Sequence, residues 1–267
     1  MIDRGKHNLL GILVDTVDYE AVVDRVLDAA REHRGAAISA LAVHGIMTGV
    51  LDPTHRYRLN RFDLIVPDGQ PVRWALNLMY GTRLEDRVYG PELTLRVCAR
   101  AAEEQAPVFF YGSTQPVLER MQCNLLKRFP RLQIAGMEPS KFRRLTPEEA
   151  IELSTRIRQS GATIVFAGLG CPRQETWAYE FRDLVSMPIL AVGAAFPFIA
   201  GEVRQAPERL QRIGMEWFFR LCMEPKRLWR RYAFLNPAYV ALVTMQCARI
   251  RTFDTEGIMP ESSMLFG

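Results

Sequence analysis

The sequence predicts an α/β protein with a Rossmann-like parallel sheet flanked by helices, followed by a helical C-terminal appendage. Short apolar runs alternate with segments of helical periodicity, and this strand signal stops after Gly201. The runs lack the alternating polar positions of a half-exposed sheet, which is typical of strands covered by helices on both faces. Repeated alternation of this kind indicates a doubly wound sheet. We therefore expect an α/β core over residues 1–200, a basic helical appendage over 201–251 and a flexible tail over 252–267.

Six apolar runs are the expected strands, at residues 36–43, 63–66, 107–111, 132–135, 163–166 and 188–192. Helical periods lie between them: residues 19–34 and 116–129 each place apolar side chains on one face. The stretch Thr146-Pro-Glu-Glu opens a further helix. Threonine caps a helix, proline suits its first turn, and acidic residues favour the positive end of its dipole.

Composition bounds the class of protein. With 267 residues, 48% of them hydrophobic, the chain can bury a full core. Its five cysteines are scattered without a C-x-x-C pair, so neither a disulfide framework nor a zinc site is expected, and a reducing cytoplasm is favoured. The N-terminus precedes only a short apolar run broken by Asp15, which argues against a signal peptide. No stretch reaches the roughly 18 apolar residues that a spanning helix needs.

The net charge of +4 is concentrated in one segment. Between Gly201 and Arg231, eight Lys and Arg side chains stand against four acidic ones, so this segment alone carries +4. A neutral body with a basic segment suits an acidic partner, such as a phosphate or an anionic membrane surface. A solvated helix face is the simpler interpretation, and it stays open.

The first candidate site is Val66-Pro-Asp68-Gly69, directly after the strand at 63–66. A carboxylate at the C-terminal end of a parallel strand points into the ligand crevice, where it can act as a general base. Pro-Asp-Gly is also a favoured turn sequence, so spacing alone does not decide between the two roles. Gln70 follows and can line the same crevice.

The second candidate site is the glycine-containing stretch from Gly168 to Trp177. Glycines after a strand let the backbone approach a ligand, and the helix that follows offers its positive end to a phosphate. Gln174 and Glu175 can reach a sugar. Cys171 is a weaker candidate, as a nucleophile, because no histidine follows it; a Cys–His pair would need one of His7, His33, His44 or His55.

Two further candidate sites consist of polar or charged side chains. His44 follows an apolar run, where a lone histidine is more often structural than catalytic. Arg220, Arg227 and Arg230 would share a helix face, although Pro225 predicts a break between the first two. No H-E-x-x-H or D-x-D motif indicates a metal site, and arginines can instead neutralise a diphosphate leaving group.

An ordered set of short motifs runs through most of the chain. It comprises Val66-Pro-Asp68-Gly69, Arg87-Val-Tyr89-Gly90-Pro, Gly168-Leu-Gly170-x-Pro-x-Gln174-Glu175, Gly193-x-x-Phe196, Gly201-x-Val-x-x-Ala-Pro207, Glu216-Trp217, Arg220-Leu and Glu224-Pro-x-Arg227. This set resembles the WecG/TagA/CpsF glycosyltransferases, bacterial enzymes of cell-surface polysaccharide assembly. The resemblance implies a core of the GT-E type and transfer of a hexosyl or N-acetylhexosaminyl group from a UDP-sugar to a polyprenyl-diphosphate-linked saccharide. It further implies inversion at the anomeric carbon, no metal and no cofactor.

The resemblance also implies roles for particular residues. Asp68 is the expected base, Gln174 a polar substrate contact, and Arg220, Arg227 and Arg230 ligands of the diphosphate. The residues expected to bind substrate are His44, Gly69, Gln70, Tyr89, Gly112, Gly168, Gly170, Glu175, Gly193, Phe196 and Arg204. The appendage would complete the site at the inner face of the cell membrane, so the expected location is cytoplasmic and peripheral. Nucleic acid is not an expected partner, and a homo-oligomer stays open.

The chain departs from the family at one point. The family's Thr-x-Asn stretch is replaced here by Leu41-Ala-Val43, followed by His44-Gly45, so the threonine's contacts are either absent or supplied by His44 or Thr48. This leaves glucose and N-acetylmannosamine both open as the transferred sugar. Two other classes are alternatives: a nicotinamide-dependent oxidoreductase, which would need a full G-x-G-x-x-G, and a non-catalytic module that binds membrane or nucleic acid through the basic segment.

Overall fold

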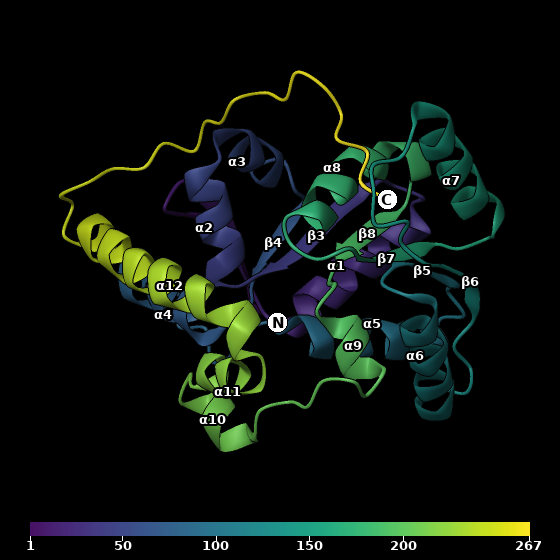
Figure 1. Ribbon diagram of the computed structural model, residues 1–267, viewed down its shortest axis with the longest axis horizontal. Coiled ribbons are helices and arrows are strands. Elements are labelled where there is room, and N and C mark those ends of the chain that lie inside the picture. The colour runs from purple at the N-terminus through teal and green to yellow at the C-terminus, as the bar shows by residue number, and fades with distance from the viewer.

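The computed structural model describes residues 1–267, except the side chains of Glu208, Arg212, Arg227 and Arg231. Its centre is a six-stranded parallel sheet in the order β4-β3-β8-β7-β5-β6 (Figure 1). The strands are β3 (Ala36–Leu41), β4 (Leu64–Pro67), β5 (Val108–Gly112), β6 (Ile134–Glu138), β7 (Ile164–Gly168) and β8 (Pro188–Ala191). The expected α/β fold is confirmed. The run at 36–43 is shorter as a strand because helix α2 begins at Val43.

Alternate residues of each strand enter two separate hydrophobic cores. Phe109 belongs to one core and Phe110 to the other, as do Val165 and Phe166 on the neighbouring strand. One face of the sheet is covered by α1 (Tyr19–Arg31), α5 (Gly90–Glu103), α6 (Gln115–Arg128) and α9 (Ala195–Ile199), and the other by α2 (Val43–Leu51), α3 (Pro53–Leu59), α4 (Gln70–Tyr80), α7 (Pro147–Gln159) and α8 (Arg173–Val185). Both faces are buried, which explains why the strands read as continuous apolar runs.

An antiparallel hairpin of β1 (Asp3–Leu9) and β2 (Ile12–Val17) precedes the sheet, and the sequence did not predict it. Its first strand is mostly polar, and its second contains Asp15. That carboxylate is buried, where it accepts a hydrogen bond from the Ile65 N–H at 2.8 Å and pairs with Lys6 at 3.2 Å. Asp15 interrupts the apolar run of β2, so the run did not look like a strand. The groups that bind its carboxylate, Ile65 and Lys6, are not part of this run.

The appendage consists of α10 (Glu208–Arg212), α11 (Glu216–Met223) and α12 (Pro225–Cys247). The break predicted at Pro225 is present, since α11 ends before it and α12 starts there. Beyond Pro237, which lies inside α12, the helix is fixed to the core. Tyr239 and Val243 are buried with residues of α2 and α4, and Gln246 hydrogen-bonds to the N–H of Leu10 and the carbonyl of Asn8, each at 2.9 Å.

The segment after α12 runs back over the body as an extended chain (Figure 1). The Asn8 side chain donates to the Phe253 carbonyl at 2.8 Å, and the Glu180 carboxylate accepts from the N–H groups of Met264 and Leu265 at 2.8 and 2.9 Å. The weak sequence pattern gave no sign of these contacts, because most of them use the backbone of the segment. That residues 252–267 are flexible stays a prediction.

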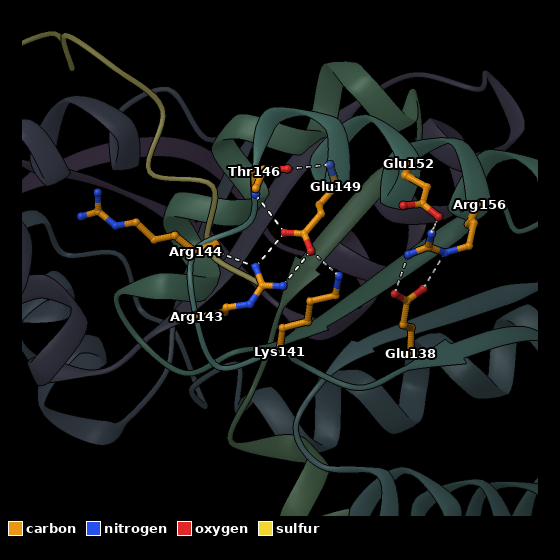
Figure 2. A network of polar contacts seen from close by, with 8 residues as sticks. All are labelled: Glu138, Lys141, Arg143, Arg144, Thr146, Glu149, Glu152 and Arg156. Atoms are coloured by element: carbon orange, nitrogen blue, oxygen red, sulfur yellow. Dashed lines mark hydrogen bonds and ion pairs between the residues drawn. The ribbon is translucent and has the colours of Figure 1, made fainter.

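The C-terminal residues end beside the loop before α7, where the N–H of Gly267 donates to the Arg143 carbonyl at 2.9 Å. Figure 2 shows the polar network that shapes this loop. Thr146 and Glu149 form the capping box that begins α7, and Glu149 also binds Lys141 and Arg143. The predicted cap at Thr146 is therefore confirmed.

Candidate active site

A cavity of about 600 Å³ lies at the C-terminal edge of the sheet. The end of β3 lines it with Leu41, and the loops after β4, β7 and β8 add Asp68, Gly170 and Gly193. Glu216, Trp217 and Arg220 of α11 line it from the appendage. Parallel α/β sheets bind their ligands at this edge, outside the carboxyl ends of the strands.

Asp68 follows β4. It is part of a turn and also presents its carboxyl to the cavity, which are the two roles that the sequence left open. Its backbone N–H continues the sheet by donating to the Leu41 carbonyl at 3.1 Å. Gly69 then takes a φ of +96°, a left-handed conformation that glycine adopts readily and that turns the chain into α4. The turn therefore leaves the Asp68 carboxyl at the strand end, in the cavity.

Asp68 is half-buried, and the protein around its carboxyl removes enough water to raise the pKa to about 7. The guanidinium groups of Arg87 and Arg220 and the N–H of Gly90 oppose this rise, whereas the negative charge of Glu216 adds to it. A carboxyl with a pKa near neutrality can take a proton at physiological pH.

Gln174, at the start of α8, is buried and all its polar positions are engaged. Its Oε1 accepts from the N–H groups of Gly170 at 3.1 Å and Gly193 at 2.9 Å. Its Nε2 donates to Glu175 Oε1 at 2.8 Å and to the Ala191 carbonyl at 3.1 Å. In this arrangement Gln174 joins the loops after β7 and β8.

Glu175 lies fully buried beneath the same loops. Its Oε1 accepts from Gln174 and from Ser39 Oγ at 3.1 Å, whereas its Oε2 has no hydrogen-bond partner among the described residues. Burial raises the pKa of this carboxyl, and hydrogen bonds from Gln174, Ser39 and Cys171 act in the opposite direction.

A buried ion pair closes the cavity on the side of the appendage. Arg87, in the segment before α5, pairs with Glu216 in the first turn of α11, and their side chains are only 7% and 12% exposed. Arg87 also lies over the Tyr89 ring at 4.4 Å and donates to Gln211 Oε1 at 3.1 Å. Next to it, Arg220 lies 5.5 Å from the Phe198 ring, and its buried Nε lacks a hydrogen-bond partner among the described residues.

The structure brings most of the residues singled out in the sequence into this one cavity. They are His44, Asp68, Gly69, Gln70, Tyr89, Gly170, Gln174, Glu175, Gly193 and Arg220. Cys171 lines it too, and of the four histidines His44 is the one that does so. Thr48 uses its hydroxyl inside α2, where it donates to the His44 carbonyl at 2.8 Å.

Five other candidates do not line the cavity. Gly112 and Gly168 lie at paired strand ends packed so closely that a Cβ on Gly112 would come within 2.7 Å of the Gly168 backbone. Phe196 is a core residue, edge-on to Phe110. Arg204 and Arg230 are exposed, and Arg230 lies over the Trp229 ring. The Arg227 side chain lies outside the described residues.

Two cavity residues, Arg87 and Glu216, were not assigned a role from the sequence. Both belong to the short motifs of the sequence analysis, and this membership was the signal that could have marked them as functional residues. Their pairing joins residues 129 positions apart, and no sequence spacing predicts such a contact.

Two comparisons agree on the relationship of this chain to known proteins. Residues 7–252 match the model of a family described as the glycosyl transferase WecG/TagA/CpsF family. A curated relative from Bacillus spizizenii is 30% identical over 193 residues, which cover 72% of each chain. That relative is an N-acetylglucosaminyldiphosphoundecaprenol N-acetyl-beta-D-mannosaminyltransferase.

Proposed function

The chain belongs to the WecG/TagA/CpsF family and is a glycosyltransferase, and from this premise we propose the reaction that its cavity performs. A hexosyl or N-acetylhexosaminyl group moves from a UDP-sugar to a polyprenyl-diphosphate-linked saccharide, in the synthesis of an exopolysaccharide or cell-wall polymer. The relative from Bacillus spizizenii supports this choice, since its name includes a sugar on diphosphoundecaprenol as acceptor. The family match disfavours the oxidoreductase and the non-catalytic module.

The observation that carries the proposal is the Asp68 carboxyl, in the cavity and with a pKa of about 7. A sugar hydroxyl is a poor nucleophile, and a carboxylate within hydrogen-bond reach accepts its proton as the attack proceeds. The acceptor oxygen then bonds to the anomeric carbon while the bond from that carbon to the diphosphate oxygen breaks. One displacement with no covalent intermediate inverts the anomeric centre. We assign the base to Asp68 rather than Glu175 because Glu175 is fully buried and its Oε1 already accepts from Ser39 and Gln174, whereas Asp68 is partly exposed in the cavity.

UDP departs with growing negative charge, which prearranged cations stabilise more in the transition state than in the ground state. Arg220 lines the cavity with a buried Nε that has no partner among the described residues, so it is ready to donate to a phosphate oxygen. We propose that Arg227 and Arg230 join it when substrate is bound. With arginines in this role, transfer needs no metal.

We also propose that the enzyme works at the inner face of the cell membrane, held there by the appendage. Within the described residues, no helix is both long enough and apolar enough to cross a bilayer. The appendage exposes Phe218, Trp229 and Phe234 close to the exposed cations of Lys226 and Arg230. Aromatic and basic side chains together suit a surface of anionic lipid, where a lipid-linked acceptor lies.

The test is a transfer assay with a panel of UDP-sugars and a polyprenyl-diphosphate-linked saccharide, each run with and without excess EDTA. With one donor of the panel, we expect release of UDP and a saccharide longer by one sugar. The rate should be the same with and without chelator, and NMR should show an inverted anomeric configuration. Retention of configuration would contradict the single displacement. Activity that disappears with EDTA and returns with Mg²⁺ or Mn²⁺ would contradict metal independence, and no transfer with any donor would contradict the proposed reaction.

A further inference from the structure

The loop that carries Arg87 is fixed to the same strand end as Asp68. The Val88 N–H donates to the Pro67 carbonyl at 2.9 Å, and the N–H of Gly90 hydrogen-bonds to the Asp68 carboxylate. Tyr89, between them, donates its N–H to the Tyr19 hydroxyl at 2.8 Å. Arg87 is therefore part of the rigid core, at a fixed place beside the candidate base.

Glu216 comes from the opposite side of the cavity. It lies in the first turn of α11, in the appendage, and its contact with Arg87 is almost fully withdrawn from water. Removing one partner of such a buried pair leaves the other charge uncompensated. The pair therefore exists in this form only while α11 is docked on the core.

Within the part of the chain that the structure describes, the groups with the largest electrostatic effect on Asp68 come from three places. Arg87 and Tyr89 belong to the segment before α5, Tyr19 to α1, and Glu216 and Arg220 to α11. The two phenols stay neutral near pH 7, because burial raises the pKa of each above its usual value. Among the described residues, the charges with the largest effect on Asp68 are the cations Arg87 and Arg220 and the anion Glu216, which pairs with Arg87. His44, Glu202 and Glu224 line the same cavity.

We propose that Glu216 is a positioning residue for sugar transfer: by pairing with Arg87 beside Asp68, it makes the strength of the general base depend on docking of the appendage. This inference rests on the proposed function, in which Asp68 is the base. With Glu216 in place, the charge of Arg87 is neutralised and the Asp68 carboxylate binds a proton strongly. Without it, Arg87 holds the carboxylate in its ionised, weakly basic form.

The test uses the full chain and the pH dependence of kcat/KM, whose acidic limb reports the pKa of the base in the free enzyme. Glu216→Gln should move the midpoint of that limb to lower pH, by roughly one unit, and lower the rate on the plateau. Arg87→Gln should move the midpoint to higher pH, because Glu216 then acts on Asp68 without compensation. The double variant should return the midpoint toward that of the unmodified enzyme. Glu216→Asp, which keeps the negative charge, should keep the midpoint close to that of the unmodified enzyme.

Shifts of opposite sign that cancel in the double variant cannot come from loss of folding, which would lower activity at every pH without moving the midpoint. Glu152→Gln removes the same charge from an exposed position on α7, and we expect no shift. Single variants that both keep the original midpoint would overturn the inference while leaving the proposed function intact. By contrast, an unmodified enzyme whose transfer rate shows no acidic limb would overturn the assignment of Asp68 as base.

Discussion

The Tyr239 hydroxyl donates a hydrogen bond to the Pro71 carbonyl oxygen at 3.2 Å. Tyr239 lies in α12 beyond Pro237, and Pro71 lies in the first turn of α4, just after Asp68. The bond therefore joins the rear half of α12 to the part of the core that carries the candidate base. Helix α11 directly precedes α12. Anchoring of the C-terminal half of α12 to the core therefore limits where α11 can place Glu216 and Arg220.

Tyr239→Phe should weaken closure of the cavity, because it removes a hydrogen bond to Pro71, a residue that lines the cavity, while Tyr239 itself does not line it. Loss of one hydrogen bond between neutral groups typically costs about 1 kcal/mol of unfolding free energy. We expect a loss of that order in denaturant unfolding and a transfer rate lowered several-fold. Tyr179→Phe on α8 is the matched control. Unchanged stability and unchanged transfer in Tyr239→Phe would mean that this bond does not fasten the appendage.

Gln174→Ala should destabilise both glycine loops. The variant removes the acceptor of the Gly170 and Gly193 N–H groups and one donor to the Ala191 carbonyl. Each lost hydrogen bond typically costs about 1 kcal/mol. We expect weaker UDP binding by calorimetry and a lower unfolding free energy, with Gln159→Ala, at an exposed position on α7, as control. If Gln174→Ala keeps its stability and loses only transfer, Gln174 contacts substrate directly instead of holding the loops.

Arg220→Ala should separate catalysis from membrane binding. Its guanidinium lines the cavity, so we expect transfer to fall by about 10²-fold or more, the scale of removing one transition-state donor. One cation contributes only about 1 kcal/mol to adsorption on anionic vesicles, so vesicle binding should persist. Lys226→Ala, exposed on the same appendage, should show near-normal transfer. Equal transfer by both variants would remove Arg220 from the reaction.

Asp68→Asn should stabilise the folded protein at high pH. The pKa of Asp68 is about 7 in the folded chain, against about 3.9 for an unfolded aspartate, so between these values only the folded state holds the proton. The stability that the carboxyl contributes is complete below pH 4 and is lost as the pH rises through 7. The asparagine does not titrate, so the variant does not lose this stability as the pH rises. The difference in unfolding free energy between the variant and the unmodified protein should therefore grow in favour of the variant by roughly 1–3 kcal/mol between pH 5 and 8. Asp183→Asn, at an exposed position, is the control. An advantage that does not change with pH would mean that Asp68 is ionised throughout.

The sheet and most of the cavity could be predicted from the sequence, because buried parallel strands read as apolar runs and their ends mark the ligand edge. Asp68, Gly170 and Gly193 follow strands in this way. Other features depend on partners far along the chain. The β1–β2 hairpin contains a buried charge whose backbone donor, Ile65, lies 50 residues further along the chain. The role of Gln174 as a substrate contact stays a prediction, and its hydrogen bonds to two glycine loops add a structural role that the motif did not indicate. The same holds for Arg87 and Glu216, whose separate motifs gave no indication that they form one ion pair.

Single-turnover transfer by Asp68→Asn shows whether Asp68 is the general base. The asparagine keeps the shape of the side chain and cannot accept the proton, and loss of a general base typically costs about 10²–10⁴ in rate. If Asp68 is the base, we expect a loss of that size from a folded variant whose affinity for UDP stays within a few fold of the original. Transfer at a near-normal rate by the same variant would show that Asp68 is only a turn residue at the end of β4, and that the base lies elsewhere in the cavity.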